Sequence, residues 1–209
     1  MDPAEVLVEE LASALGFDEG WELHRPRLAN FLRLVWEWNQ RFNLAGAQDM
    51  RSLAEVLLAD AMVLARAGLV HRGERIIDVG SGAGSPALPL ALIREDLQFL
   101  LVEARQKRVA FLRWSIATLG LTERVRVIQA HISPSRPRMP PCSYSPSLAS
   151  SRATFEPATW LKVAASLAPA ALAFVVPGTL LETNHLKARL TYRLPWSLAP
   201  REILRFEKP

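Results

Sequence analysis

Three glycines at alternating positions form the segment of this sequence with the clearest chemical meaning. They are Gly80, Gly82 and Gly84. They follow a short apolar run that ends at Asp78, and an apolar stretch with helical spacing follows at residues 87–93. This order predicts a strand, a glycine loop and a helix. Glycine leaves no Cβ where a ligand must lie flat against the main chain, and the helix start adds free N–H groups and a positive dipole end.

The spacing of the glycines indicates which nucleotide the loop accommodates. A dinucleotide-binding loop, G-x-G-x-x-G, would place its third glycine at position 85, which is Ser85 here. The observed pattern, D-x-G-x-G-x-G, is typical of S-adenosylmethionine-dependent methyltransferases. A buried strand predicted at residues 97–102 ends at Glu103, where a carboxylate can accept hydrogen bonds from a ribose diol. The alternative interpretation is a doubly wound domain with a glycine turn and a surface glutamate.

The elements that must position these residues follow from hydrophobic periodicity. Helices are predicted at residues 3–15, 25–42 and 52–67, and Gly68 is a predicted C-cap. Further strands are predicted at residues 75–79, 125–130, 170–176, 188–194 and 201–206, with helices at 86–94 and 105–119. We therefore expect an α/β fold with a parallel, doubly wound sheet and one reversed strand. Residues 1–70 are the predicted α-helical N-terminal cap, and residues 71–209 the α/β domain.

Residues 131–152 interrupt the alternation of strand and helix. This segment contains five prolines and many serines. A central strand belongs near residues 144–150, yet Pro146 lies inside that range, and proline is poorly tolerated in a central strand. The sequence leaves open whether the strand is short or the segment is a loop.

Composition narrows the class of protein further. The chain has 209 residues, half of them apolar, and a formal net charge of +4, which suits an anionic partner. The single Cys142 excludes an internal disulfide, and we expect no metal site. The N-terminus lacks a signal-peptide pattern, and the apolar stretch Ala164–Val176 is too short to span a bilayer. We therefore expect a cytoplasmic monomer that does not associate with membranes.

Five segments together resemble one family. Residues 38–46, WNQRFNLAG, resemble the signature W-N-x-x-[YF]-N-L-[TS], and residues 78–84 match the same family's glycine loop. Residues 101–112 resemble its second strand and following helix, residues 151–153 its S-R-A motif, and residues 201–208 its basic last strand. The family is the bacterial glucose-inhibited division protein B family, whose members methylate guanine N7 in small-subunit (16S) ribosomal RNA.

The resemblance implies a Rossmann-like class I methyltransferase fold, S-adenosylmethionine as cofactor, and ribosomal RNA or the small ribosomal subunit as partner. It also implies site residues. Arg152 would lie beside the reactive end of the cofactor, and Asn39 and Asn43 would face the same cleft from the helical cap; Arg152 and Asn39 are the catalytic candidates. The cofactor-binding candidates are Gly80, Ser81, Gly82, Gly84, Ser85, Glu103, Ala104, His131, Ile132, Ser133 and Arg152.

The sequence also departs from the family pattern at four places. A His-x-x-Asp-Ser element corresponds to residues 57–61, which have Leu57 and Ala61 at the histidine and serine positions. The usual continuation of the glycine loop is replaced by Ser-Pro-Ala, acidic residues are absent from residues 130–134, and a Lys-Gly pair is replaced at Pro177. Two alternatives therefore stay open: a diverged paralogue that methylates another RNA or a small molecule, and a non-catalytic module that binds the cofactor or the ribosome.

Several polar and aromatic residues allow two interpretations. Trp36 and Trp38 can stack on RNA bases or pack in the core. The basic turn at residues 105–108 can contact phosphate or form a solvated helix start. His131 can contact the cofactor or belong to a solvated loop.

Overall fold

The computed structural model describes residues 2–17, 20–42, 44–140, 144–182 and 184–208. The expectations for Asn43 and Cys142 lie outside the described residues. The elements are α1 (Pro3–Ala14), α2 (Arg25–Asn39), α3 (Met50–Arg66), β1 (Arg75–Val79), α4 (Ala87–Ile93), β2 (Gln98–Glu103), α5 (Gln106–Thr118), β3 (Val125–Gln129), β4 (Leu148–Ser151), α6 (Pro157–Ala164), β5 (Ala170–Val175), β6 (Leu186–Arg193) and β7 (Pro200–Glu207). Of these, only α6 lacks a counterpart among the predicted ranges.

The seven strands form one mixed sheet in the order β3-β2-β1-β4-β5-β7-β6. The first five strands in this spatial order, β3-β2-β1-β4-β5, are parallel to their neighbours. Strand β7 runs antiparallel to both β5 and β6. This arrangement confirms the predicted α/β fold with a reversed strand near the end of the chain. The carboxyl ends of β1, β2, β3 and β4 meet at one edge of the sheet, where ligands bind in open α/β folds.

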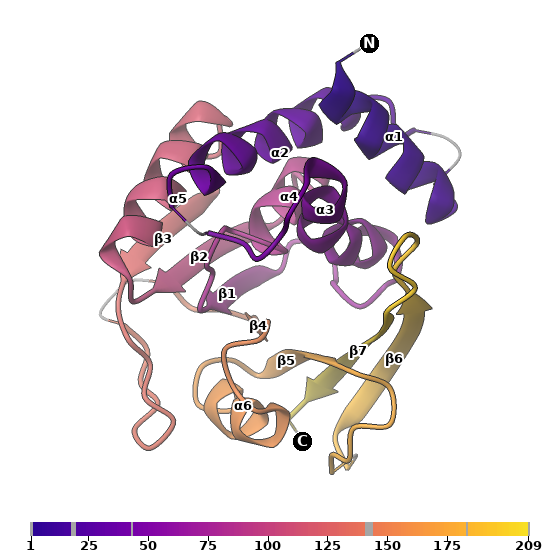
Figure 1. Ribbon diagram of the computed structural model, residues 1–209. Helices are drawn as coiled ribbons and strands as arrows, with labels where there is room; N and C mark the ends of the chain where they lie inside the picture. The colour runs from indigo at the N-terminus through magenta and orange to yellow at the C-terminus, as the bar shows by residue number, and fades with distance from the viewer. Residues whose placement is uncertain (1, 18–19, 43, 141–143, 183, 209) are drawn as a thin grey trace.

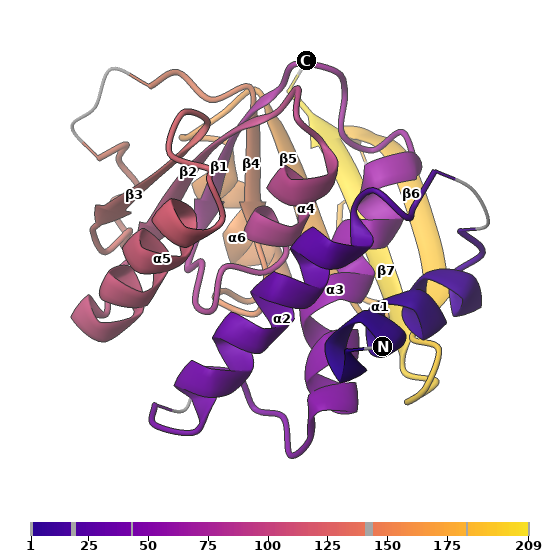
Figure 2. The ribbon, with the colours of Figure 1, turned by 90° about the horizontal axis from the view of Figure 1, so that it is seen from above.

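The two faces of the sheet are covered unequally. Helices α1 to α5 lie on one side and α6 on the other (Figures 1 and 2). The larger core joins the three N-terminal helices to the sheet, with Leu32 and Leu58 in the same cluster as Leu88 and Phe111. The smaller core packs α6 against the opposite face through Trp160 and its neighbours. The N-terminal helices therefore share a hydrophobic core with the glycine loop and its helix.

The central strand β4 is short. It begins at Leu148, two residues after Pro146, so the proline lies just outside the sheet and removes no ladder hydrogen bond. In the parts of the β3–β4 connection that the structure describes, residues 130–140 and 144–147, no helix is present. The Tyr144 hydroxyl instead donates to the carbonyl of Gln98 at 2.9 Å. The described parts of the proline-rich segment are thus irregular chain, anchored to β2 by a tyrosine.

Helix α2 ends at Asn39, three residues before the predicted boundary, because of a specific side-chain contact. The Asn39 amide oxygen accepts hydrogen bonds from the backbone N–H groups of Leu44 at 2.8 Å and Ala45 at 3.0 Å. A side chain that satisfies backbone donors in this way competes with continued helix. Helix α3, in contrast, begins with a capping box between Asp49 and Ser52 and is followed by Gly68 at a φ of +70°.

Candidate functional site

The glycine loop begins at a buried carboxyl group at the end of β1. Asp78 is 2% exposed, and its Oδ1 accepts a hydrogen bond from the Ser150 hydroxyl at 3.0 Å. Burial raises the pKa of Asp78 to about 6, because the charged form loses its hydration. The N–H groups of Gly80 and Ser81 both donate to the Val102 carbonyl, at 2.8 and 3.3 Å. Strand β2 therefore fixes the start of the loop.

The glycines of the loop differ in what surrounds them. Gly80 has a φ of +76°, and a Cβ there would lie 2.7 Å from the Thr154 side-chain atom Cγ2. A Cβ on Gly84 would lie 2.5 Å from Leu88. Gly82 also has a positive φ, +57°, but the nearest atoms to a Cβ there are 3.8 and 3.9 Å away. The loop is thus packed at Gly80 and Gly84 and has room at Gly82.

Glu103 lies at the end of β2 and faces this same loop. Glu103 is only 4% exposed. Its Oε2 accepts from the Gly82 N–H at 2.9 Å, and its Oε1 accepts from the Arg105 N–H at 2.9 Å. A carboxylate has about four acceptor positions, so two remain for the hydroxyls of a ribose. The next residue, Ala104, is exposed.

The segment after β3 brings three further predicted residues to this edge of the sheet. His131 is exposed, and Ile132 is buried in the smaller core. The Ser133 hydroxyl lies 2.9 Å from the Ser135 hydroxyl. Ile132 therefore offers apolar surface near the carboxyl end of β3, whereas His131 points to a solvated position.

Arg152, in the S-R-A segment after β4, is bound to the helical cap. Its Nη1 donates to Asp60 Oδ2 at 2.7 Å and to the Val56 carbonyl at 2.7 Å, both on α3. The second oxygen of Asp60 accepts from the Tyr192 hydroxyl on β6. Burial and the Asp60 charge raise the pKa of Tyr192, so the phenol stays protonated. This cluster joins three elements around a carboxylate that is 2% exposed.

The S-R-A segment itself is held tightly to β1. The Ser151 hydroxyl donates to the Val79 carbonyl at 2.8 Å, and the Thr154 hydroxyl donates to the same carbonyl at 3.3 Å. Ala153 has a φ of +57°, a conformation that costs a non-glycine residue roughly 1–2 kcal/mol. Thr154, which covers Gly80, was not among the predicted site residues; its place three residues after β4 was the only signal.

Two of the predicted residues are used in internal contacts. The Ser85 hydroxyl donates to the Leu57 carbonyl at 2.6 Å, so it lies between the glycine loop and α3. The Asn39 amide oxygen holds the chain after α2, as described above. The two positions that differ from the family pattern on α3, Leu57 and Ala61, are both buried. Apolar side chains therefore pack where the family pattern has a histidine and a serine.

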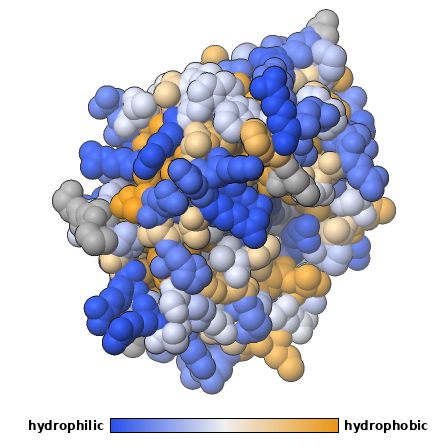
Figure 3. Space-filling model, turned by 60° about the vertical axis from the view of Figure 1, so that its left-hand side comes forward, coloured by the Kyte–Doolittle hydropathy of each residue, from blue (hydrophilic) through white to orange (hydrophobic). Residues whose placement is uncertain are grey.

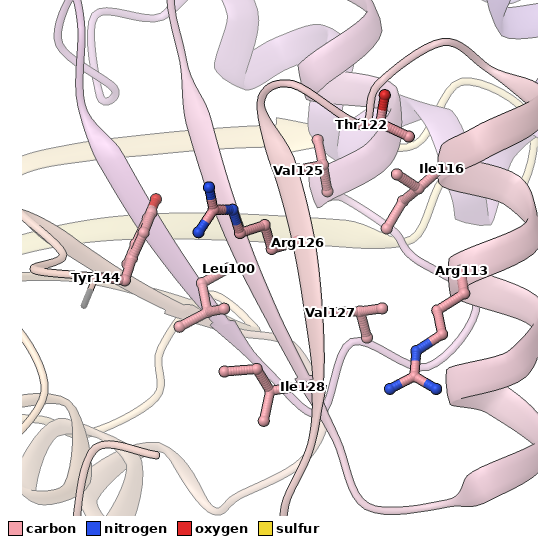
Figure 4. Close-up of a pocket in the computed structure, with 9 residues that line it drawn as sticks. All are labelled: Leu100, Arg113, Ile116, Thr122, Val125, Arg126, Val127, Ile128 and Tyr144. Atoms are coloured by element: carbon pink, nitrogen blue, oxygen red, sulfur yellow. The ribbon is translucent and has the colours of Figure 1, made fainter. Parts of the chain in front are cut away.

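A separate cavity of about 460 Å³ lies along the edge strand β3. Figure 4 shows its lining on both sides of the strand, with Leu100, Ile128 and Tyr144 on one side and Arg113 and Ile116 of α5 on the other. It extends along β3 from Val125, at the opposite end of the strand from the glycine loop. Its position separates it from the site around Glu103.

The strand order and the glycine loop at the carboxyl ends of β1 and β2 define a class I S-adenosylmethionine-dependent methyltransferase fold. The chain is similar to the methyltransferase domain of METTL16, with a TM-score of 0.56 and 11% identity over 90% of this chain and 81% of that one. It is also similar to an S-adenosylmethionine-dependent methyltransferase from Aquifex aeolicus, with a TM-score of 0.50 and 16% identity over 72% and 90% of the two chains. At these identities the likeness concerns the fold alone.

The sequence comparisons give the family. The family model described as rRNA small subunit methyltransferase G matches residues 24–184, and the chain belongs to this family, as the five segments predicted. It is 35% identical to the ribosomal RNA small subunit methyltransferase G of Methylococcus capsulatus, over 60% of this chain and 59% of the relative. It is 43% identical to that of Helicobacter pylori, over 46% and 52%. The chain thus spans about half the length of the curated relatives it matches.

Proposed function

We propose that this chain binds S-adenosylmethionine at the loop between β1 and α4 and methylates guanine N7 in small-subunit ribosomal RNA. One observation carries the proposal: the Glu103 carboxylate accepts a hydrogen bond from the Gly82 N–H, and Gly82 is the only glycine of the loop with open space next to it. The relatives' names, which specify methylation of small-subunit ribosomal RNA, supply the substrate. The net charge of +4 agrees with an RNA partner.

The residues around the loop fit the parts of this cofactor. Glu103 has acceptor capacity for the ribose hydroxyls, and the open side of Gly82 leaves space against the backbone. Ile132 and Ser133 would flank the adenine, while Gly80 and Ser81 form the part of the loop nearest Thr154. Gly84 and Ser85 would act indirectly, since Gly84 packs on α4 and Ser85 on α3. Ala104 and His131 are exposed positions at the rim.

The reaction requires little from the protein beyond the alignment of its two substrates. S-adenosylmethionine, when bound, supplies an electrophilic methyl group. Guanine N7 carries an exposed lone pair and no proton, so no general base is required. The chain's residues would hold N7 in line with the methyl carbon and exclude water, and such positioning supplies much of the rate enhancement in two-substrate reactions.

Arg152 is the residue we assign to the target base. Only its Nη1 is engaged by Asp60 and Val56 among the described residues, which leaves Nε and Nη2 for an acceptor of the RNA. A planar guanidinium suits a guanine edge or a phosphate. Asp60 would then be a positioning residue that acts through Arg152, and Asn39 would shape the cap from the end of α2.

The first test measures cofactor binding. Isothermal calorimetry of the purified chain with S-adenosylhomocysteine should show one site, and Glu103→Gln should weaken it about 10-fold or more, since it removes charge-assisted hydrogen bonds. His185→Gln, remote from the loop, is the control and should bind normally. Absence of binding heat in the unmodified chain would exclude the proposed function.

The second test measures methyl transfer. The chain is incubated with labelled S-adenosylmethionine and small subunits from cells that lack the host enzyme, and the modified base is mapped. Label on guanine N7 of the small-subunit RNA is the expected result. Label on another base or RNA would support the diverged-paralogue alternative instead.

A non-catalytic cofactor- or ribosome-binding module remains the second candidate, because specific contacts favour it. Asn39 is occupied by backbone donors, and Leu57 and Ala61 are buried and apolar at positions where the family pattern is polar. Cofactor binding without methyl transfer to small subunits or naked RNA would select this candidate.

The place of action follows from the proposed substrate. A protein that methylates ribosomal RNA would act in the cytoplasm, with residues 1–70 serving as the helical cap of the site. In the part of the chain that the structure describes, no helix has both the length and the apolarity to cross a membrane.

A further inference from the structure

An aromatic groove lies between the end of α2 and the outer side of α5. Its aromatic residues are Trp38 on α2, Phe42 just after it and Trp114 on α5. The Trp38 ring centroid is 5.6 Å from that of Phe42 and 5.5 Å from that of Trp114. Phe111 packs under Trp38 at 5.3 Å, which fixes the cluster to the core. The groove has a volume of about 610 Å³, and Glu37, Gln40 and Arg41 complete its lining.

Two of these rings are exposed to solvent. Trp114 is 40% exposed and Phe42 is 38% exposed. The other large exposed hydrophobic residues of the described chain are aliphatic and lie on other segments: Leu23, Val176, Leu180 and Leu198. Rings that remain partly uncovered beside a groove offer flat surface for stacking, which is how proteins hold unstacked nucleobases.

Two cations, Arg41 and Lys107, lie at the groove, whose lining contains one acidic residue, Glu37. Arg41 lines it, and the Lys107 ammonium lies 5.2 Å from the centroid of the Phe42 ring. Arg41, Lys107 and Arg108 have no ion pair among the described residues, whereas Arg27, Arg51 and Arg94 each have one and Arg25 has two. Figure 3 brings this side forward and shows strongly hydrophilic residues next to hydrophobic ones. The local charge therefore suits a polyanion.

The placement of these cations opposes the helix dipole. Lys107 and Arg108 lie in the first turn of α5, and that turn contains no acidic residue. The N-terminus of a helix carries partial positive charge, so cations there are unfavourable by several tenths of a kcal/mol each. The Glu103 carboxylate, which accepts from the Arg105 N–H at 2.9 Å, offsets part of this charge, and a bound anion would offset more of it.

The groove is also close to the proposed cofactor loop. The Arg108 Nη1 lies 3.9 Å from the position that a Cβ on Gly82 would occupy. The first turn of α5 thus borders the glycine loop, and α5 runs beside α2 (Figure 1). Trp114 lies about two turns further along α5, and its ring contacts that of Trp38 on α2. Helix α5 therefore contributes residues both to the groove and to the border of the loop.

From this arrangement we infer that the α2–α5 groove binds single-stranded RNA, with one unstacked base on Trp114 and Phe42 and the adjoining phosphates on Arg41 and Lys107. Glu37 and Gln40 supply hydrogen-bonding groups for the edge of that base. The inference rests on the proposed function, since it gives the RNA substrate a path to the cofactor loop. It favours RNA over an acidic protein segment, because an acidic peptide uses the cations but gains little from two exposed rings.

The experiment measures binding of a short fluorescein-labelled single-stranded oligoribonucleotide by anisotropy, at several salt concentrations and with no cofactor present. Trp114→Ala should weaken binding roughly 10-fold with an unchanged salt slope, because stacking is not ionic. Lys107→Gln should weaken binding and lower the salt slope by about 0.7, since one phosphate contact is lost. Trp114→Phe retains a stacking ring and should bind nearly as well as the unmodified chain.

Controls separate this inference from general charge effects and from misfolding. Arg72→Gln removes an exposed cation in the turn between α3 and β1 and should leave binding unchanged. Normal S-adenosylhomocysteine binding by the Trp114 and Lys107 variants would show an intact fold and loop. Equal RNA binding by Trp114→Ala and the unmodified chain would overturn the inference, as would tighter, Trp114-dependent binding of a polyglutamate peptide. Neither result would contradict the proposed function, which the cofactor-binding and methyl-transfer experiments test separately.

Discussion

Two carboxyl groups near the proposed site are buried to the same extent and have opposite surroundings. Asp78, at the start of the glycine loop, and Asp60, on α3, are each 2% exposed. Asp78 accepts a hydrogen bond from the Ser150 hydroxyl and has no ion pair among the described residues. Its pKa is raised to about 6 by burial. Asp60 is held by the Arg152 guanidinium and by Tyr192.

The difference shows that the loop side and the cap side of the site are stabilised in different ways. The loop depends on glycine backbone conformations and on hydrogen bonds from its backbone N–H groups, to the Val102 carbonyl and to the Glu103 carboxylate. The cap is tied to the α/β domain by a charged cluster that joins α3, the segment just after β4, and β6. Substitutions on the loop side should therefore disturb the backbone conformation and the proposed cofactor binding. Substitutions on the cap side should weaken the attachment of α3 to the α/β domain.

The largest expected effect comes from Gly80 compared with Gly82. Gly80→Ala should lower the free energy of unfolding by about 2–4 kcal/mol, because a positive φ is combined with a collision with Thr154. Gly82→Ala should cost only about 1 kcal/mol, since its surroundings are open. Urea denaturation of both variants measures the difference. Equal losses would contradict the contrast between a packed and an open glycine.

The next effect concerns pH and Asp78. Its pKa in the folded chain, about 6, lies above the ordinary value of 3.8, so the folded state binds more protons than the unfolded state between these pH values. Asp78 should therefore reduce stability as the pH rises from about 4 to 6, by up to about 3 kcal/mol. Asp78→Asn should remove this component from unfolding curves measured across that range. The same pH dependence in the variant would show that Asp78 is not its source.

A smaller effect than that of Gly80→Ala or of Asp78 is expected at the cap. Arg152→Ala leaves the buried Asp60 without its cation and should lower the free energy of unfolding by about 2 kcal/mol, less than for a fully enclosed pair because the arginine is partly exposed. Arg189→Ala is the matched control: it also faces a buried acid, Glu202, but is more than half exposed, and it should cost under about 1 kcal/mol.

A readout of function sharpens this last comparison. Arg152→Ala should retain S-adenosylhomocysteine binding in calorimetry while it loses methyl transfer, since Glu103 and Gly82 are untouched. A double-mutant cycle with Asp60→Asn should show that the two substitutions are not additive. Additive losses would mean that the pair does not couple α3 to the segment after β4.

Sequence patterns predicted the parts of this molecule in which neighbouring residues decide the structure. The D-x-G-x-G-x-G loop and Glu103 form one local strand–turn–helix unit and its next strand, and both lie where the pattern indicated. Helix α6 was missed although it carried usable signals, a Glu156 cap and a proline at its first position. Its shortness and the apolar run that follows it hid the helical period.

Long-range contacts were beyond the reach of those patterns. Asp60 meets Arg152 across 92 positions and Tyr192 across 132 positions of the chain, and no spacing rule links such residues. Pro146 argued against a strand that nonetheless forms two residues later. Asn39 matches a family signature, but only the folded chain shows that its amide oxygen is taken by two backbone N–H groups.

The sequence by itself thus determined the class of fold, the glycine loop and its partner carboxylate, because strands, turns and helices are set by periodicity and by backbone freedom over a few residues. The tertiary structure decided which charges are paired and which are left free. Packing brought Arg152 onto Asp60 and left Arg41 and Lys107, at the groove that contains Trp114, without an ion pair among the described residues. Ion pairing requires that side chains from segments far apart in the chain lie within a few ångströms of each other. Such residues come together only when the helical cap packs against the sheet.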